Sequence, residues 1–455
     1  MKNGKVWLLA LAMLFLWSCE CMGEQGTPVR VLTLDEALKI ALERNPGLQV
    51  TQDKAEKAQH KLGQAKAALL PQLSVSGSWT QQGPVSTFTI PTPEGPREIT
   101  LGQSRYRRAS INLAQPLDLA GQIRASRQAA KLGLSTALAD VERAANSLAL
   151  DVYTAYYGVL RAREGVRVAQ DAVNAAKEHL RIAEAQYKAG MAPQFEVIRA
   201  SVQVENLRQN LIQAQNAERL ALANLVNVLG LEPGSEIDVA PATQPSQEES
   251  GKTPAYEDAL KEAYSRRPEV KQAEEGVKIS QQMVKAAKAQ SRPDVTIVGN
   301  YVFTPDATGF VAIKESWAVT ANLTIPLDSS GAIRAKVKEA LADLKAAENT
   351  LSQVKQGIGL EVRAALLDLQ NAEERRRTAA ANVTQAEEAL RIARVRFQAG
   401  MATGVEVTDA EVALTQAKTN QVNAEYDYLL AQAKLEKAIG KLLDKVHAVL
   451  EEDKK

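Results

Sequence analysis

Apolar residues recur in steps of four and three along two long stretches of the chain that contain no proline. A repeat of this kind, sustained over so many turns, is typical of helices that pack against partners as a coiled coil. One position of each step is nearly always Ala, which lets helix backbones approach closely. The pattern predicts helices over 121–189 and 331–399, each about 100 Å long at roughly 1.5 Å per residue. The first seam comprises Leu148, Val152, Ala155, Val159, Ala162, Val166, Ala169, Val173, Ala176, Leu180, Ala183 and Tyr187, and the second Ile358, Val362, Ala365, Leu369, Ala372, Arg376, Ala379, Val383, Ala386, Leu390, Ala393 and Phe397.

A glycine follows each predicted long helix, and the chain then returns. Gly190 and Gly400 supply the left-handed conformation that commonly ends a helix. Apolar residues then recur at helical spacing over 194–229 and 405–439, and another glycine ends each of these segments. Each half of the chain is therefore predicted to contain a long antiparallel helical hairpin with a tight turn at its tip.

Before each predicted long helix, apolar residues alternate with small polar residues. This period of two predicts β-strands that have one apolar face. Between the first two strands, residues 81–103 are rich in Gly, Pro and Thr and are predicted to form a loop. The four strands are expected at about 73–80, 105–116, 294–303 and 316–326.

The chain contains two copies of one structural unit. Asn112–Arg124 reappears as Asn322–Arg334 with eight of thirteen residues identical, at an offset of 210. An earlier segment, Leu34–Pro46, matches Tyr256–Pro268 at an offset of 222. The capping box Thr33–Glu36 opens a helix there, and the step Asn45-Pro46 is predicted to break or kink it early. The sequence thus predicts a mainly α fold of two tandem repeats, each a helix, a β-hairpin, a long helix and a returning helix. The repeats cover 30–230 and 254–440, the linker between them 231–253, and a C-terminal tail 441–455.

Composition excludes several classes of function. The 55 basic and 54 acidic residues nearly cancel, which gives no basic surface for nucleic acid. The three histidines lie far apart without ligand spacing, and no phosphate loop, GxSxG elbow, HExxH or CxxC motif occurs. We therefore expect neither an enzyme nor a bound metal or cofactor.

The N-terminus is typical of an exported protein. Two lysines precede the apolar run Val6–Trp17, which is too short to span a bilayer. We predict a signal peptide over 1–18, with Cys19 as an acylated first residue of a lipoprotein. A cut after Gly23, which would remove both cysteines of the chain, is the alternative. No later stretch reaches about 18 apolar residues, so no transmembrane helix is predicted.

The four strands point to a membrane wall built from several chains. Strands with one apolar and one small-polar face suit a transmembrane β-barrel, but four strands cannot close one. Two chains would supply eight strands and a filled interior, whereas three would supply twelve and leave room for a pore. We favour three. A soluble hairpin packed on the helices is the alternative interpretation of the strands.

The order of elements, together with the two tip sequences, resembles the TolC-like outer-membrane efflux proteins. Gln186–Val197 reads QYKAGMAPQFEV and Arg396–Val407 reads RFQAGMATGVEV, which is similar to the family's periplasmic tip motif. The resemblance covers about residues 30 to 440 and implies a homotrimer in outer-membrane lipid. It implies a 12-stranded barrel continued by a 12-helix coiled-coil tunnel across the periplasm, and as partners an inner-membrane transporter and a periplasmic adaptor.

The resemblance also implies a gate at the tip. Glu406 and Asp409 stand where the family carries acidic rings at its closed entrance, and the first repeat has Glu196 and Arg199 there, a pair that can neutralise itself. In the family the acidic group at position 196 is bonded by an aromatic hydroxyl and a basic residue of the second repeat. Phe397 and Ala402 occupy those places, so this latch is expected to be absent or rebuilt, through Arg199 or Arg396. Predicted adaptor-docking residues are Gly190, Met191, Gly400 and Met401.

The resemblance implies an outer-membrane channel-tunnel of a tripartite efflux system, a passive exit duct for small molecules driven by the pump and the adaptor. Two other functions remain open at this point. A periplasmic coiled-coil adaptor or scaffold would share the heptads but would usually carry one helical hairpin rather than two. An outer-membrane duct of a type I protein secretion system would share every feature described above. The substrate cannot be read from the sequence, because the partner pump selects it.

Overall fold

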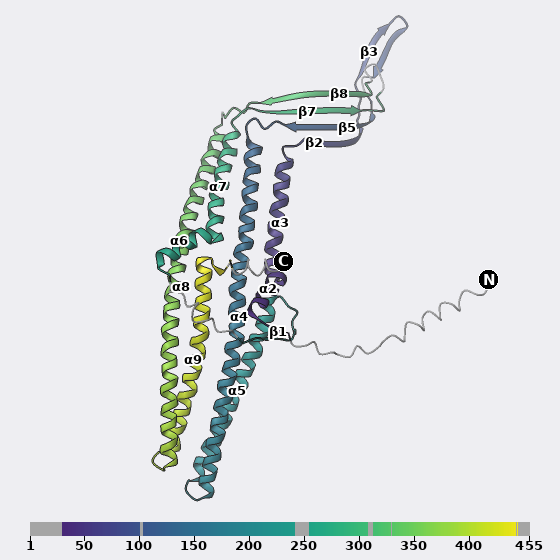
Figure 1. Ribbon diagram of the computed structural model, residues 1–455. Helices are drawn as coiled ribbons and strands as arrows, with labels where there is room; N and C mark the ends of the chain where they lie inside the picture. The colour runs from purple at the N-terminus through teal and green to yellow at the C-terminus, as the bar shows by residue number, and fades with distance from the viewer. Residues whose placement is uncertain are drawn as a thin grey trace, which may run out of the picture.

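The computed structural model describes residues 30–100, 103–241, 254–307, 313–328, 330–442 and 444 (Figure 1). The predicted signal peptide 1–18, the predicted lipidation site Cys19 and most of the tail 441–455 lie outside the described residues.

The first repeat begins with a short strand and ends with a long helical hairpin. Where the sequence predicts long helices over 121–189 and 194–229, the structure has α4 and α5 over Gln122–Lys188 and Gln194–Leu229. The elements before them are β1 (Arg30–Leu32), α2 (Leu34–Arg44), α3 (Pro46–Ala67), β2 (Gln72–Gln81), β3 (Thr87–Thr92), β4 (Gly95–Thr100) and β5 (Arg105–Pro116).

The second repeat has the same order of helices and strands, without the extra strand pair. Its long helices are α8 (Ala332–Gln398) and α9 (Gly404–Ile439), against predictions of 331–399 and 405–439. The chain reaches it through β6 (Ile237–Val239), and its other elements are α6 (Tyr256–Arg266), α7 (Pro268–Ala289), β7 (Asp294–Phe303) and β8 (Glu315–Thr324).

The protomer is elongated, with the two helical hairpins side by side below one sheet (Figure 1). The hairpins α4–α5 and α8–α9 end in two neighbouring turns far from the sheet. Their seams are packed as the heptads predict, since Val152, Val159 and Val362 are 0% exposed. The single break in the second seam, Arg376, places its guanidinium 4.2 Å from the ring centroid of Tyr428, which accommodates the charge by a cation–π contact. Among the described residues, no helix combines the length and the apolar character needed to cross a membrane.

In each repeat a different residue connects the returning helix to the short helices at the equivalent position. Asn45 lies at the break between α2 and α3, accepts hydrogen bonds from the first amides of α3, and donates to the carbonyl of Val228 at 2.9 Å. Its counterpart at offset 222 is Arg267, between α6 and α7, which donates to the carbonyl of Ala438 at 3.4 Å. Because 438 is 228 plus 210, the two bonds are equivalent under the internal repeat. The returning helix of each repeat is thus fixed to the preceding short helices by a side chain that reaches its last turn.

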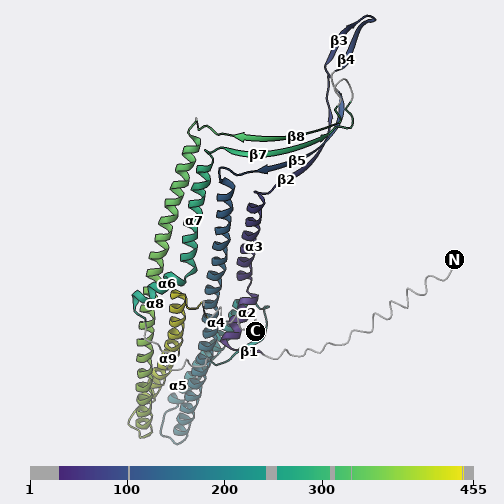
Figure 2. The same cartoon turned by 45° about the horizontal axis from the view of Figure 1, so that its top comes forward.

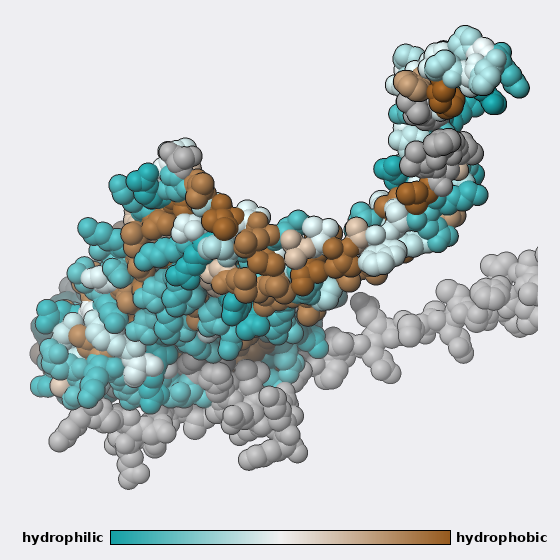
Figure 3. Space-filling model, turned by 90° about the horizontal axis from the view of Figure 1, so that it is seen from above, coloured by the Kyte–Doolittle hydropathy of each residue, from teal (hydrophilic) through white to brown (hydrophobic). Residues whose placement is uncertain are grey.

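Four antiparallel strands, in the order β2-β5-β7-β8, form one sheet that joins the two repeats. Strand β5 of the first repeat pairs with β7 of the second, with Ile111 opposite Tyr301. Alternation puts apolar side chains on one face, including Val75, Trp79, Ile111, Leu113, Trp317 and Val319. The other face carries mainly Ser, Thr and Asn, and the hydroxyls of Ser76 and Ser110 lie 2.7 Å apart on it. Apolar residues gather over the sheet in Figure 3, whereas hydrophilic residues cover most of the helices.

The prediction that residues 81–103 form a loop is wrong. Strands β3 and β4 pair there as an antiparallel hairpin, with Phe88 opposite Ile99, and project beyond the far end of the sheet (Figure 2). The prolines of this stretch obscured the alternation of Thr87, Phe88, Thr89 and Ile90. Pro91 and Pro96 are tolerated because each strand of an isolated hairpin has a free edge.

The linker predicted over 231–253 is not entirely outside the folded body. Strand β6 pairs in parallel with β1, and Val239 is 1% exposed in the core of the first repeat. The hydroxyl of Tyr156 lies at hydrogen-bond distance from the carbonyls of Leu32 (3.2 Å) and Ala240 (2.8 Å), which joins both strands to α4. A pair of three-residue strands gives little sequence signal, because its stability comes from these tertiary contacts.

Candidate functional site

The two turns at the end of the helical hairpins have the same backbone geometry. Gly190 and Gly400 both adopt φ of 73°, a left-handed conformation that a side chain would strain. In each turn the amide of the following methionine donates to a carbonyl five residues earlier, at 2.9 Å. The side chains of Met191 and Met401 are left 76% and 67% exposed. The turns therefore present one apolar side chain each at the end of the molecule.

The acidic residues predicted for the gate differ in their surroundings. Glu406 and Thr403 form a capping box at the start of α9. The carboxylate of Glu406 also lies 3.3 Å from a guanidinium nitrogen of Arg396, so its charge is offset within its own hairpin. Asp409 is exposed, and no ion pair to it exists in the described part of the chain. The two carboxylates were expected to act alike, but the charge of Glu406 is compensated and that of Asp409 is not.

Glu196 contacts the second repeat rather than Arg199. Glu196 and Arg199, whose spacing allows them to neutralise each other, form no ion pair in the described tip. Instead, Oε2 of Glu196 lies 2.9 Å from the position where a Cβ of Gly404 would be. Nε2 of His179 lies 3.7 Å from that same point, and the ring centroids of His179 and Phe397 are 5.6 Å apart. Phe397 therefore contacts the first repeat through a ring rather than through a polar bond.

Sequence reasoning did not single out His179 or Gly404, although the comparison of the two repeats contained a signal. At the offset of 210, His179 corresponds to Ala389 and Gly404 to Gln194. His179, which is larger than its counterpart Ala389, lies next to Gly404, which is smaller than its counterpart Gln194. This combination lets the hairpins approach closely at this level. The suggested role of Arg396 in a rebuilt latch is not what the structure shows, because Arg396 pairs with Glu406.

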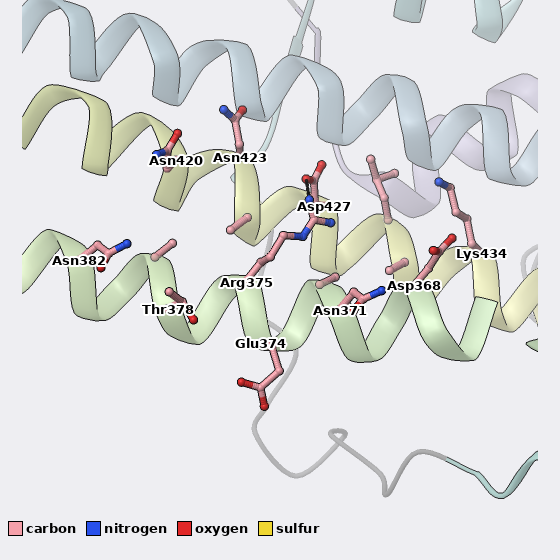
Figure 4. A pocket seen from close by; sticks show the side chains of 15 residues that line it. Asp368, Asn371, Glu374, Arg375, Thr378, Asn382, Asn420, Asn423, Asp427 and Lys434 are labelled. Carbon is pink, nitrogen blue, oxygen red and sulfur yellow. Dashed lines mark ion pairs between the residues drawn. The ribbon is translucent and has the colours of Figure 1, made fainter. Parts of the chain in front are cut away.

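Higher along the second hairpin, a polar groove of about 900 Å³ opens between α8 and α9 (Figure 4). Arg375 of α8 and Asp427 of α9 point toward one another across it, at 3.4 Å. Asp427 also lies 3.5 Å from Arg161 of α4, so one carboxylate binds both repeats. Asparagine side chains line the rest of the groove, at 371, 382, 420 and 423. No group of three or more His, Cys, Asp or Glu in the described ranges could hold a metal ion.

A methyl group at position 404 is expected to displace Glu196 and so break its contact between the two hairpins at the tip. In Gly404→Ala the new Cβ would meet Glu196 at 2.9 Å, so this flexible carboxylate must move away. The helix itself gains from Ala, and we expect stability to change by less than about 1 kcal/mol. If the tip closes a channel, as the resemblance implies, single-channel conductance should rise, whereas Gly357→Ala, in open space on α8, should leave it unchanged. Equal conductance of both variants and the parent protein would contradict a role for this contact.

The model of the family described as "Outer membrane efflux protein" matches residues 37–231 and 259–441. The chain belongs to this outer membrane efflux protein family. The two matched segments nearly coincide with the two structural repeats, and the gap between them contains all of the linker but its first residue. The family is one of outer-membrane channels of Gram-negative bacteria, which serve tripartite efflux or type I secretion and are not enzymes. Its members form trimers and act with adaptors and inner-membrane pumps.

Individual proteins are similar to this chain over almost its whole length, in sequence or in structure. The outer membrane protein TolC of Vibrio cholerae is 24% identical, covering 94% of this chain and 95% of its own. The pyoverdine export outer membrane protein OpmQ of Pseudomonas putida is also 24% identical, with coverage of 90% and 85%. A crystal structure of CusC superposes with a TM-score of 0.76 at 19% identity, covering 90% of this chain and 92% of that one.

Proposed function

We propose that three copies of this chain form a continuous duct, with twelve strands in the outer membrane and twelve long helices below them. The observation that carries the proposal is the incomplete sheet: within the described part of the chain, β2 and β8 each lack a neighbour on one side. Open strand edges in hydrocarbon leave backbone groups unpaired, which is too costly to persist. Three sheets of four strands give twelve, enough for a barrel with an open interior.

The helical layer supports the same assembly. α5 carries the exposed residues Ile198, Val202, Ile212 and Leu220 on one face, and Leu220 is 72% exposed. α8 carries Leu360, Leu367 and Ile392 in a similar exposed line, with Leu360 also 72% exposed. Two different apolar edges on one protomer suit a head-to-tail contact, which closes into a ring when the rotation allows it.

We further propose that the duct is a passive exit for small molecules. The name of the related OpmQ specifies export of pyoverdine, a small molecule, which supports this choice over protein secretion. Transport would be driven by an inner-membrane pump, and the exposed Met191 and Met401 would dock a periplasmic adaptor. Asp409, Glu406 and the contact between Glu196 and Gly404 would control the entrance at the tip. The chain itself would catalyse no reaction.

The mass of the purified protein in detergent, together with its conductance in a planar lipid bilayer, tests this function. We expect a species of three protomers that conducts ions in discrete steps, because only a closed ring shields the strand edges. A monomer that inserts no channel, or a protein recovered in the soluble fraction without detergent, would overturn the proposal and favour a periplasmic scaffold.

A further inference from the structure

The polar face of the sheet is almost free of charge. Strand alternation assigns to it the small residues Ser74, Ser76, Ser78 and Ser110, as well as the amides Asn112 and Asn300. Of the positions on this face of the four strands, only Arg108 and Asp294 are charged. Asp294 lies at the end next to the helices, where its carboxylate accepts the amide of Leu119 at 3.0 Å. A single charged side chain, Arg108, therefore remains near the other end of the face.

The surroundings of Arg108 differ from those of the arginine beside it. Arg107 points to the opposite, apolar face and donates two side-chain hydrogen bonds to Asp306, at 2.8 and 2.7 Å. Arg108 has no ion pair within the described residues. It lies opposite the small Ser78, and its guanidinium carbon is 5.6 Å from the ring centroid of Tyr106. A cation–π contact of this kind attracts the guanidinium toward the ring while leaving its N–H groups free to donate hydrogen bonds.

Neighbouring carboxylates do not compensate this charge. Asp306 is engaged by Arg107, and Glu98 of β4 accepts a hydrogen bond from Thr87 of β3. Glu315 of β8 lies opposite Phe303, which belongs to the apolar face. Arg108 is thus a fixed positive charge on a neutral polar surface, toward the end of β5 from which the β3–β4 hairpin projects (Figure 2).

We propose that Arg108 is an anion-binding residue, and that three copies form a guanidinium ring inside the outer end of the barrel. The inference rests on the proposed trimeric channel, in which the polar face lines the interior. A narrow passage with low-dielectric walls strengthens the field of a ring of like charges. Guanidinium groups bind the planar edges of carboxylates and phosphates with paired hydrogen bonds. The ring favours permeants that carry such groups and attracts multivalent anions from the outer side.

Block by inorganic tripolyphosphate, added on the barrel side of a planar bilayer at low salt, tests this assignment. We expect the wild-type channel to be blocked, and the half-blocking concentration to rise about tenfold or more in Arg108→Gln, because three charge contacts are lost together. Arg108→Lys should retain most of the block. Arg105→Gln, an exposed arginine that alternation places on the apolar face, is the matched control and should behave as wild type.

Each outcome separates this inference from the proposed function. If wild type forms no channel, the trimeric duct fails and the ring fails with it. If the channel conducts but Arg108→Gln is blocked as strongly as wild type, the anion site alone is wrong. Arg108→Glu gives a second measurement should the Gln variant not assemble. It should lose block by tripolyphosphate and acquire block by Mg²⁺ from the barrel side, and unchanged behaviour would again contradict the site.

Discussion

Replacing Arg267 by Ala is expected to lower the free energy of unfolding by about 2–4 kcal/mol. The side chain of Arg267 is 5% exposed, and its guanidinium lies 2.9 Å from Glu269 and 2.6 Å from Glu361. Removing it leaves Glu269, whose side chain is 23% exposed, without its cation, and the last turn of α9 without a donor. Glu361 is half-exposed and can be solvated, which keeps the cost below that of a fully buried pair. Unfolding by guanidinium chloride in detergent, followed by far-ultraviolet circular dichroism, measures the change in free energy.

The pH dependence of the free energy of unfolding distinguishes loss of the Arg267 charge from loss of packing. Burial raises the pKa of Glu269, but the hydrogen bonds and charge of Arg267 outweigh burial and leave that pKa below its usual value. In wild type the stability that ionised Glu269 contributes through Arg267 is therefore present above about pH 4.3. It is lost as the pH falls through the lowered pKa. In Arg267→Ala burial is opposed only by a backbone hydrogen bond and by the charge of Arg143, so the pKa of Glu269 should rise. The stability lost at neutral pH should then be partly regained in acid, whereas a pure packing defect would be independent of pH.

A substitution taken from the first repeat provides the matched control. Asn45 performs the equivalent task there with an amide and also caps α3, so Arg267→Asn should give α7 a side-chain cap that Arg267 does not supply, and recover about 1 kcal/mol relative to Ala. Lys271→Ala, which removes a surface contact of 3.9 Å to Glu142, should change stability by less than about 0.5 kcal/mol. If Arg267→Ala lowers the free energy of unfolding no more than Lys271→Ala does, the contacts of Arg267 do not contribute to stability.

The internal repeat and the heptads predicted the architecture because both are local or periodic signals. The alternating seam from Leu148 to Tyr187 identifies α4 without any knowledge of its partners. The sequence did not reveal the equivalent roles of Asn45 and Arg267, because an amide and a guanidinium differ in chemistry. Their shared role is seen only in the structure, where both donate to equivalent carbonyls. Periodicity predicts which face is buried, but it does not predict which polar groups meet across that face.

The candidate site shows the same limit at the level of single charges. Spacing alone suggested that Glu196 neutralises Arg199 and that Glu406 acts together with Asp409. The structure instead turns Glu196 toward Gly404 and pairs Glu406 with Arg396, a residue ten positions earlier across the turn. Contacts across a tight turn or between hairpins depend on rotamers and close packing, which one sequence does not specify.

Removal of both acidic side chains in Glu406→Ala, Asp409→Ala is expected to raise single-channel conductance and to abolish block by multivalent cations added on the tip side. Carboxylates at a narrow entrance concentrate cations, and a ring of three Asp409 groups would bind a multivalent cation more strongly than one. Conductance in planar bilayers, with and without Mg²⁺ or a trivalent cation on that side, is the measurement. Unchanged conductance and block would remove this pair from the gate.

The separate variants show which carboxylate is responsible. Because Arg396 already offsets Glu406 at 3.3 Å, the exposed Asp409 supplies the uncompensated charge, and Asp409→Ala alone should remove most of the block. Glu406→Ala should also weaken the block, since it releases the guanidinium of Arg396 to repel cations. Adding Arg396→Ala to Glu406→Ala should then restore the block, because Asp409 is left without an opposing charge. Failure of this restoration would mean that Glu406 binds the cation itself, and that its pairing with Arg396 opens when a cation arrives.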